Sequence, residues 1–294
     1  MASSETSGSR IELKDSRAAF FEAFPPSMLA ALAWIGAMLF LALSAPLLAP
    51  YDYMRADVLA RLQPPVFFGG TWDHPLGTDE LGRDLLSRLL ISIRISIVIA
   101  VIATLISTSI GVLLGFAAAY FRGLTEEIIL ILVDAQLAMP FMIIAIAVLA
   151  FFGNSLALFV VLLGFNGWET VTRIARGLAI SATEQGYAKA VRDIGASPWR
   201  IYFRHILPNI AATIIVAMTL NVPGVILLES ALSFLGIGIQ PPETSLGNMV
   251  GYGRSYLQSA PWILLLPSIV IVLTTLSISL VGDWLRDHLD PTLS

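Results

Sequence analysis

The stretch IRISIVIAVIATLISTSIGVLLGFAAAY, residues 93–120, decides the class of fold. A transmembrane α-helix needs about 20 consecutive, mostly apolar residues to cross a hydrocarbon core of about 30 Å, and this run exceeds that length. Soluble domains do not repeat runs of this kind, whereas this chain holds several of them. The sequence therefore predicts an all-α polytopic membrane protein.

The composition of the 294 residues agrees with this class. Hydrophobic residues make up 56% and charged residues only 13%, with a mean hydropathy of +0.81. A typical soluble domain carries about 25% charged residues. The net charge of −4 argues against nucleic acid as a partner. The lack of cysteine excludes disulfides, thiolate metal sites and a cysteine nucleophile.

Six apolar runs are predicted to span the membrane. They cover residues 27–49, 93–120, 128–152, 155–174, 210–239 and 262–281. The fourth run is interrupted by Asn166, Glu169 and Arg173. The fifth contains Asn221 and the pair Pro223-Gly224, which predicts a tilted or broken helix.

The basic residues orient the chain, because lysine and arginine are enriched in cytoplasmic loops. With both termini in the cytoplasm, eleven of the 17 basic residues lie inside, six of them over residues 173–208. The segment 50–92 holds four arginines on the outside, but long loops count for less in this rule. This topology places Asp79 outside the cell and Ala188 in the cytoplasm.

A charged insert separates the fourth and fifth runs: YAKAVRDIGASPWRIYFRHILPN, residues 187–209. Helix formers over 183–194 predict a helix that ends at Gly195, which readily takes the left-handed conformation. Ser197-Pro198 then supplies an N-cap and a first-turn proline for a second helix, which is predicted to end before Pro208. A loop that only fixes topology does not need two capped helices. We therefore favour a docking surface over a merely topogenic loop.

The insert resembles the EAA loop of ABC-importer permeases, whose pattern is Glu-Ala-Ala, three residues, Gly, nine residues, Ile, one residue, Leu-Pro. On this chain the pattern falls on Lys189, Ala190, Val191, Gly195, His205, Leu207 and Pro208. Lys189, Val191 and His205 depart from the family residues. The stretches HPLGTDELGRDLLSRLL (74–90), LLESALSFLGIGIQPP (227–242) and GDWLRDHLDP (282–291) resemble the C-type subunit of the dipeptide/oligopeptide/nickel branch.

The resemblance implies a type I ABC-importer permease fold with six transmembrane helices and a cytoplasmic coupling helix. It divides the chain into a cytoplasmic N-terminal tail (1–26), a first transmembrane helix with an extracytoplasmic segment (27–92), and a permease core of five transmembrane helices (93–291) that carries the coupling loop 180–208. The implied location is the bacterial inner membrane, with both termini in the cytoplasm.

The same resemblance implies the partners and the cargo. They are a second homologous permease, two cytoplasmic P-loop ATPases, an extracytoplasmic substrate-binding protein and membrane lipid. The implied cargo is a peptide or a related small solute, with a nickel chelate, glutathione, an opine or a sugar as alternatives. A secondary carrier and a structural membrane protein without a pathway are the other classes.

The implied ATPase-coupling residues lie in the insert. They are Tyr187, Lys189, Ala190, Arg192, Asp193, Gly195, Ala196, Ser197 and Pro198. The chain has only two lysines, and neither stands in the Gly-Lys-Ser/Thr sequence of a P-loop. We therefore expect no enzyme activity and no cofactor in this chain, with ATP and magnesium used by the partner subunits.

Ionisable groups inside membrane spans normally face protein or water. Asp134, Asn221 and Glu229 are therefore candidates for lining a translocation pathway, and the alternative is that hydrogen bonds to neighbouring helices satisfy them. The three histidines stand far apart without metal-ligand spacing, so no metal site is expected. Ser107, Gly111 and Gly115 form a small-residue face that predicts close helix packing within the subunit.

Overall fold

The computed structural model describes residues 25–289, except for the side chains of Gly186, Tyr187 and Lys189. The helices are α2 (Pro26–Leu48), α3 (Leu85–Phe121), α4 (Gly123–Ala138), α5 (Phe141–Phe152), α6 (Leu156–Gly164), α7 (Trp168–Glu184), α8 (Gly186–Asp193), α9 (Pro198–Arg200), α10 (Leu207–Phe234), α11 (Leu246–Gly253) and α12 (Trp262–Leu289). Within these residues there is no strand. The predicted all-α fold is confirmed, and the predicted tail lies almost wholly outside the described residues.

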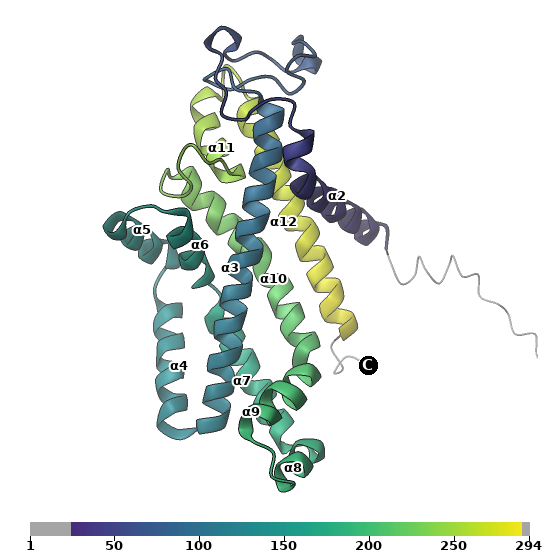
Figure 1. The fold of residues 1–294 in the computed structure, drawn as a ribbon, viewed down its shortest axis with the longest axis vertical. Coiled ribbons are helices and arrows are strands. Elements are labelled where there is room, and N and C mark those ends of the chain that lie inside the picture. The colour runs from purple at the N-terminus through teal and green to yellow at the C-terminus, as the bar shows by residue number, and fades with distance from the viewer. Residues whose placement is uncertain (1–24, 290–294) are drawn as a thin grey trace, which may run out of the picture.

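The long helices form an elongated bundle (Figure 1). α10 contacts both α3 and α12, and α2 packs against α3 and α12. On the other side α3 packs against α4 and α7. The segment 50–84 and helix α11 lie at one end of the bundle, whereas α8 and α9 lie at the opposite end.

The number of spans differs from the prediction. Four helices are long and apolar enough to cross a membrane: α2, α3, the helix Pro198–Phe234 and α12. α4 and α5 pass the same test only together, bent by 89°, and make a fifth span if the pair crosses the membrane as one. The bend lies at Met139-Pro140, because a residue before proline avoids the helical region.

The predicted fourth span, 155–174, is divided into α6 and α7 by a turn. Gly167 takes a left-handed φ of 94° in this turn. α6 has only 9 residues, and α7 carries the charged residues that interrupted the run. Within the described residues, no further helix is therefore long and apolar enough to count as a sixth span.

The fifth span was predicted to be tilted or broken, and it is not broken, because α10 continues through Pro223 and Gly224. A proline inside a helix removes one backbone hydrogen bond and tends to kink the helix. Here the neighbouring Asn221 donates from Nδ2 to Ser107 Oγ of α3 at 3.0 Å. Together with packing on α3 and α12, this contact supports the helix beside the proline.

Two hydrophobic clusters share α3 and α10. The first lies toward the end with the 50–84 segment and includes Leu85, Val225 and Ile263. The second lies toward α8 and α9 and includes Phe116, Ala175 and Ile206. Because α3 is one continuous helix of 37 residues, it joins both clusters. The expected boundary between residues 92 and 93 falls inside this helix.

The small-residue face of α3 packs against α7 within the subunit, as the sequence predicted. A Cβ atom on Gly111 would lie 2.6 Å from Val171 Cβ, and one on Gly115 would lie 2.8 Å from both Ala175 Cβ and Thr172 O. Real Cβ atoms do not approach so closely, so the two helices are nearer than any larger residue allows.

We predict that Gly115→Ala destabilises the purified subunit by about 1–3 kcal/mol, because the added methyl group forces α3 and α7 apart. Gly177→Ala is the matched control: a Cβ there meets nothing within 4 Å, so it should stabilise α7 by up to about 1 kcal/mol. Thermal unfolding in detergent measures both. An equal Tm for the two variants would contradict the close packing.

Candidate functional site at the loop between α7 and α10

We call the loop between α7 and α10, residues 185–206, the elbow loop. It contains the predicted elbow, which lies at the end of α8. Gly195 has φ 84° and donates its N–H to Arg192 O at 2.9 Å, while Ala196 N donates to Val191 O at 3.3 Å. This pair of bonds is the Schellman arrangement, in which a left-handed residue satisfies the last carbonyls of a helix. The predicted stop at Gly195 is confirmed.

The restart after the elbow is also confirmed. Ser197 Oγ accepts a hydrogen bond from Arg200 N at 3.4 Å, and Pro198 occupies the first turn of α9. The predicted end before Pro208 is wrong, however, because the chain continues through a π-helical turn, Ile201–Ile206, into α10.

The π turn explains how a helix continues into a proline. Leu207 N donates to Tyr202 O, five residues back, rather than four. Such a widened turn leaves room for a ring that would otherwise meet the carbonyl four residues before it. Pro208 then occupies the first turn of α10, directly after the π turn.

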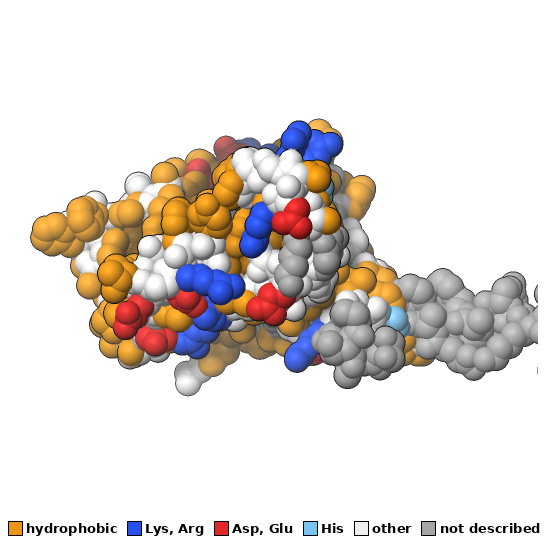
Figure 2. Space-filling view, turned by 90° about the horizontal axis from the view of Figure 1, so that it is seen from below, with side chains coloured by type: hydrophobic (Ala, Val, Ile, Leu, Met, Phe, Trp, Pro, Cys, Tyr) orange, Lys and Arg blue, Asp and Glu red, His pale blue; other side chains and the backbone are white. Residues whose placement is uncertain are grey.

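The outer side of the elbow loop is exposed at the end of the bundle that Figure 2 shows from below. The side chains of Ile194 and Trp199 are 83% and 68% exposed, which is unusual for large apolar residues. Neither residue was among the predicted coupling residues. Of those, Ala196 is partly buried and six are exposed: Ala190, Arg192, Asp193, Gly195, Ser197 and Pro198. Tyr187 and Lys189 lie in α8, but their side chains are outside the described residues.

The inner side of the elbow loop is packed into the second hydrophobic cluster. Val191 and Ala196 contact that cluster, and Ala188 is fully buried. Phe116 of α3 meets the rings of Tyr202 and Phe203 edge-on at 5.2 and 5.7 Å. The elbow loop is therefore fastened to α3, α7 and α10 on one side and presents apolar and charged groups on the other.

Asp134 lies on α4 and pairs with Arg173 of α7. Both side chains remain exposed, at 66% and 50%. A second pair joins the same helices, since Arg176 Nε donates to Glu126 Oε1 at 2.6 Å. The structure therefore brings Asp134 together with a basic partner and not with Asn221 or Glu229.

Glu229 is 1% exposed and surrounded by hydroxyl groups. Ser233 Oγ donates to its Oε1 at 2.8 Å, and Ser96 Oγ and Ser230 Oγ donate to its Oε2 at 3.3 and 3.4 Å. Asn221 lies two turns away and bonds Ser107 instead. Both residues therefore have the hydrogen bonds that were the alternative to lining a pathway. That Asn221 and Glu229 line a pathway stays a prediction.

A buried polar row on α3 was missed by the sequence analysis. Arg88 binds the buried Asp79, Ser92 Oγ lies 2.9 Å from Thr244 Oγ1, and Ser96 Oγ accepts from Leu246 N at 3.2 Å. These α3 residues recur every four positions and therefore share one face of the helix. That spacing of polar residues in an apolar helix was the available signal.

The row joins two stretches singled out in the sequence, 74–90 through Asp79 and 227–242 through Glu229, to which Ser96 Oγ donates. Asp79 also accepts from Arg83 Nε at 2.7 Å and from the backbone N–H groups of Leu81 and Arg83. One buried carboxylate therefore fixes the turn 79–83 and attaches it to α3.

Two family profiles match this chain. Residues 111–294 match the binding-protein-dependent transport system inner membrane component, and residues 26–65 match the N-terminal TM domain of oligopeptide transport permease C. The chain is also similar to curated proteins over most of its length. The oligopeptide transport system permease protein OppC of Mycobacterium tuberculosis is 41% identical over 268 residues, which is 89% of this chain and 90% of that protein.

Two further relatives are named for the transport of other cargoes. The di/tripeptide transport system permease protein DppC of Pseudomonas aeruginosa is 38% identical over 257 residues, 87% of this chain and 85% of that protein. The glutathione transport system permease protein GsiD of Pectobacterium atrosepticum is 36% identical over 276 residues, 93% of this chain and 90% of that protein.

We predict that Asp79→Ala destabilises the protein by about 3–5 kcal/mol, because it leaves the Arg88 guanidinium buried without its counter-charge. The exposed Asp73 provides the control, and Asp73→Ala should change stability by less than about 0.5 kcal/mol. Limited proteolysis should cut the 50–84 segment faster in the first variant alone. Equal resistance of the two variants would show that Asp79 does not hold the segment.

Proposed function

The chain belongs to the inner-membrane component family of binding-protein-dependent transport systems, and we propose from this membership how its structure serves the import of peptides. It is a multi-pass permease subunit of an ABC importer, and its relatives are oligopeptide and dipeptide permeases. ATP is hydrolysed by separate ATPase subunits, and a substrate-binding protein completes the system.

The observation that carries the proposed mechanism is the two-sided elbow loop. Its outer side offers Ile194 and Trp199 to a partner, and its inner side is packed on α3, α7 and α10. The predicted coupling residues from Tyr187 to Pro198 seat in a groove of one ATPase. When the ATPases bind ATP and close, they push the elbow loop. Because this loop is packed on α3, α7 and α10, these helices move with it.

The subunit transmits this push as one body. The helix Pro198–Phe234 and the helix Leu85–Phe121 are each continuous, and both run from the second hydrophobic cluster to the first. Asn221 braces them against each other beside Pro223, where α10 is weakest. Motion at the elbow loop therefore reaches the opposite end of the bundle and changes how the subunit faces the second permease.

The face of α4 and α7 meets the second, homologous permease or the water between the two. The exposed Asp134 lies on α4, in the predicted third span, and an exposed charge within a span is costly against lipid. A water-filled pathway or a polar partner removes this cost. Asp134 is accordingly the pathway candidate that we favour among the three.

Both termini lie in the cytoplasm in this proposal, with the elbow loop. The loop residues carry the excess of arginine that marks a cytoplasmic side. The 50–84 segment and α11 then lie outside, where the binding protein docks. Asp79 and Ala188 are both buried, so neither suits chemical labelling, whereas Leu59 and Ile194 are 97% and 83% exposed.

The cargo is a short peptide. Oligopeptide and di/tripeptide permeases match the chain at 41% and 38% identity. Glutathione is a second candidate, because a glutathione permease matches at 36% identity over more of the chain. No ATP or magnesium binds this chain in either case, since both belong to the partner subunits.

We predict that Gly195→Leu abolishes most ATP-driven peptide uptake while the subunit stays in the membrane at near-normal abundance. A side chain at a left-handed position costs roughly 1–2 kcal/mol of backbone strain, and leucine adds bulk on the docking side. The measurement is peptide uptake, membrane abundance and co-purification of the ATPases.

Gly123→Leu is the matched control for this prediction. Gly123 also has a positive φ, of 53°, and a Cβ there also meets nothing within 4 Å, but it lies outside the elbow loop. Uptake should fall far less in this variant. Normal uptake by Gly195→Leu, or equal loss in both variants, would remove the coupling role of the elbow.

We also predict the side of the membrane that each end faces. In this cysteine-free chain, Leu59→Cys should react with a membrane-impermeant maleimide in intact cells, and Ile194→Cys only after permeabilisation. Reaction of Ile194→Cys in intact cells would reverse the topology and exclude ATPase docking at the elbow loop.

A further inference from the structure

An aromatic patch lies on the 50–84 segment, at the end of the bundle opposite the elbow loop. It consists of Phe67 and Phe68, whose side chains are 63% and 64% exposed and whose ring centroids lie 5.1 Å apart. Residues 62–72 carry no charged side chain, although the rest of the segment is rich in charge. Large apolar side chains that lie together on a surface mark a contact with a membrane or a partner.

The loop that carries the aromatic patch has a fixed shape. Pro65 O accepts a hydrogen bond from Phe68 N at 2.8 Å, which closes a turn under the two rings. Leu62 and Leu76, which flank the loop, pack against the first hydrophobic cluster. The apolar side chains of this region are thus divided between two faces, and the rings of the patch lie on the face that no residue of the subunit covers.

The start of α12 gives the depth of the aromatic patch in the membrane. Residues 262–282 carry no charged side chain, and about 20 helical residues cross the hydrocarbon core of about 30 Å. Trp262, the first residue of α12, therefore stands at the edge of this core, where tryptophan is enriched. Its ring centroid lies 6.4 Å from that of Phe68. The patch continues the apolar surface of a membrane-spanning helix at the level where that helix meets the head groups.

The end of α2 gives the same depth independently. The exposed residues of α2 from Leu32 to Leu48 carry no polar side chain, as expected of a surface in contact with lipid. Tyr51 follows three residues later, and its N–H donates to Ser87 Oγ in the first turn of α3 at 3.1 Å. The segment that carries the aromatic patch therefore begins at the surface of the bilayer.

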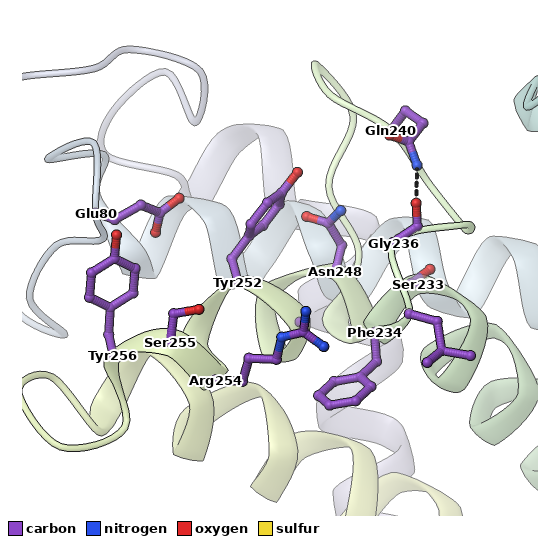
Figure 3. A pocket seen from close by; sticks show the side chains of 12 residues that line it. Glu80, Ser233, Phe234, Gly236, Gln240, Asn248, Tyr252, Arg254, Ser255 and Tyr256 are labelled. Carbon is purple, nitrogen blue, oxygen red and sulfur yellow. Dashed lines mark hydrogen bonds between the residues drawn. The ribbon is translucent and has the colours of Figure 1, made fainter.

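The polar groups at this end of the molecule gather at a different place. A pocket of about 290 Å³ between α11, the end of α10 and the 50–84 segment is lined by polar side chains that include Glu80, Gln240, Tyr252 and Arg254 (Figure 3). Neither ring of the aromatic patch belongs to its lining. An interface with a soluble protein is about as polar as the rest of the protein surface, which suits the pocket. A patch of two phenylalanines without a charged neighbour in its loop suits lipid instead.

We propose that Phe67 and Phe68 insert into the membrane surface and anchor the 50–84 segment to lipid. The proposed topology makes this the outer leaflet. The anchor holds the segment to the bilayer, while the pair Asp79–Arg88 holds it to α3. The inference goes beyond the proposed import of peptides, since it depends on α12 crossing the membrane and not on the cargo.

The cysteine-free chain allows the depth of each position to be measured directly. Phe67→Cys and Phe68→Cys each receive a nitroxide label, in the complete complex of both permeases and both ATPases in nanodiscs of phosphatidylethanolamine and phosphatidylglycerol. Electron paramagnetic resonance with power saturation compares collisions of the label with oxygen, which concentrates in lipid, and with chromium oxalate, which stays in water. Each variant keeps the other phenylalanine of the patch.

Leu59→Cys is the matched control on the same segment. Leu59 is also a large apolar residue and is 97% exposed, but charged residues, Asp57 and Arg61, stand two positions away on both sides. We expect the ratio of oxygen to chromium oxalate collisions to be severalfold higher at both patch positions than at Leu59, with or without the binding protein. If Phe68→Cys does not assemble because it loses the contact with Trp262, Phe67→Cys decides alone.

Three results would overturn the proposal. A ratio at the patch positions as low as that at Leu59 would place the rings in water. Loss of collisions with both reagents only when the binding protein is added would assign the patch to that protein. Loss of both without the binding protein would mean that the second permease covers the patch. Peptide uptake tests the proposed function separately, since its failure would leave the measured depth unchanged.

Discussion

The continuity of α3 is the constraint on which the rest of the subunit depends. With 37 residues and a rise of about 1.5 Å per residue, the helix is about 55 Å long, more than the hydrocarbon core of a bilayer requires. Its first turns hold Asp79 and the 50–84 segment through Arg88, its middle holds α10 through Ser96 and Ser107, and its last turns hold α7 through Gly111 and Gly115. Each of these three elements is positioned by a side chain, or by the lack of one, on this single helix.

In the mechanism that we propose, this arrangement allows an exposed loop to act on a distant site. A loop that was only loosely connected to the bundle would move without moving the helices. This one is packed through Val191 and Ala196 into the second hydrophobic cluster, which α3 and α10 share. Coupling between sites needs a rigid element or a pair of alternative packings between them. The two continuous helices supply the first, and the bent pair α4–α5, which turns by 89° at Pro140, is where we propose that the second permease meets this subunit.

The sequence predicts the features that local rules decide. Apolar run length predicts α2, α3 and α12, and the Gly195 and Ser197 signals predict the elbow, because left-handed glycine and a capping hydroxyl act within a few residues. The errors lie where tertiary packing overrides those rules. Pro208 and Pro223 do not end helices, since a π turn accommodates one and the Asn221 contact supports the other. Arg88 was counted as an external loop charge, and only the folded chain brings Asp79 to it.

A distance measurement tests most directly the claim that the subunit moves as one body. Nitroxide labels at Leu59→Cys and Ile194→Cys, both exposed and at opposite ends, report the length of the bundle in this cysteine-free chain by double electron–electron resonance. The account predicts the same distance distribution in the complete complex without nucleotide and with trapped ATP, while the distance from Ile194→Cys to a label on the second permease changes. A shift of the distance within the subunit on trapping ATP would contradict it, because the elbow loop would then move independently of the helices that hold it.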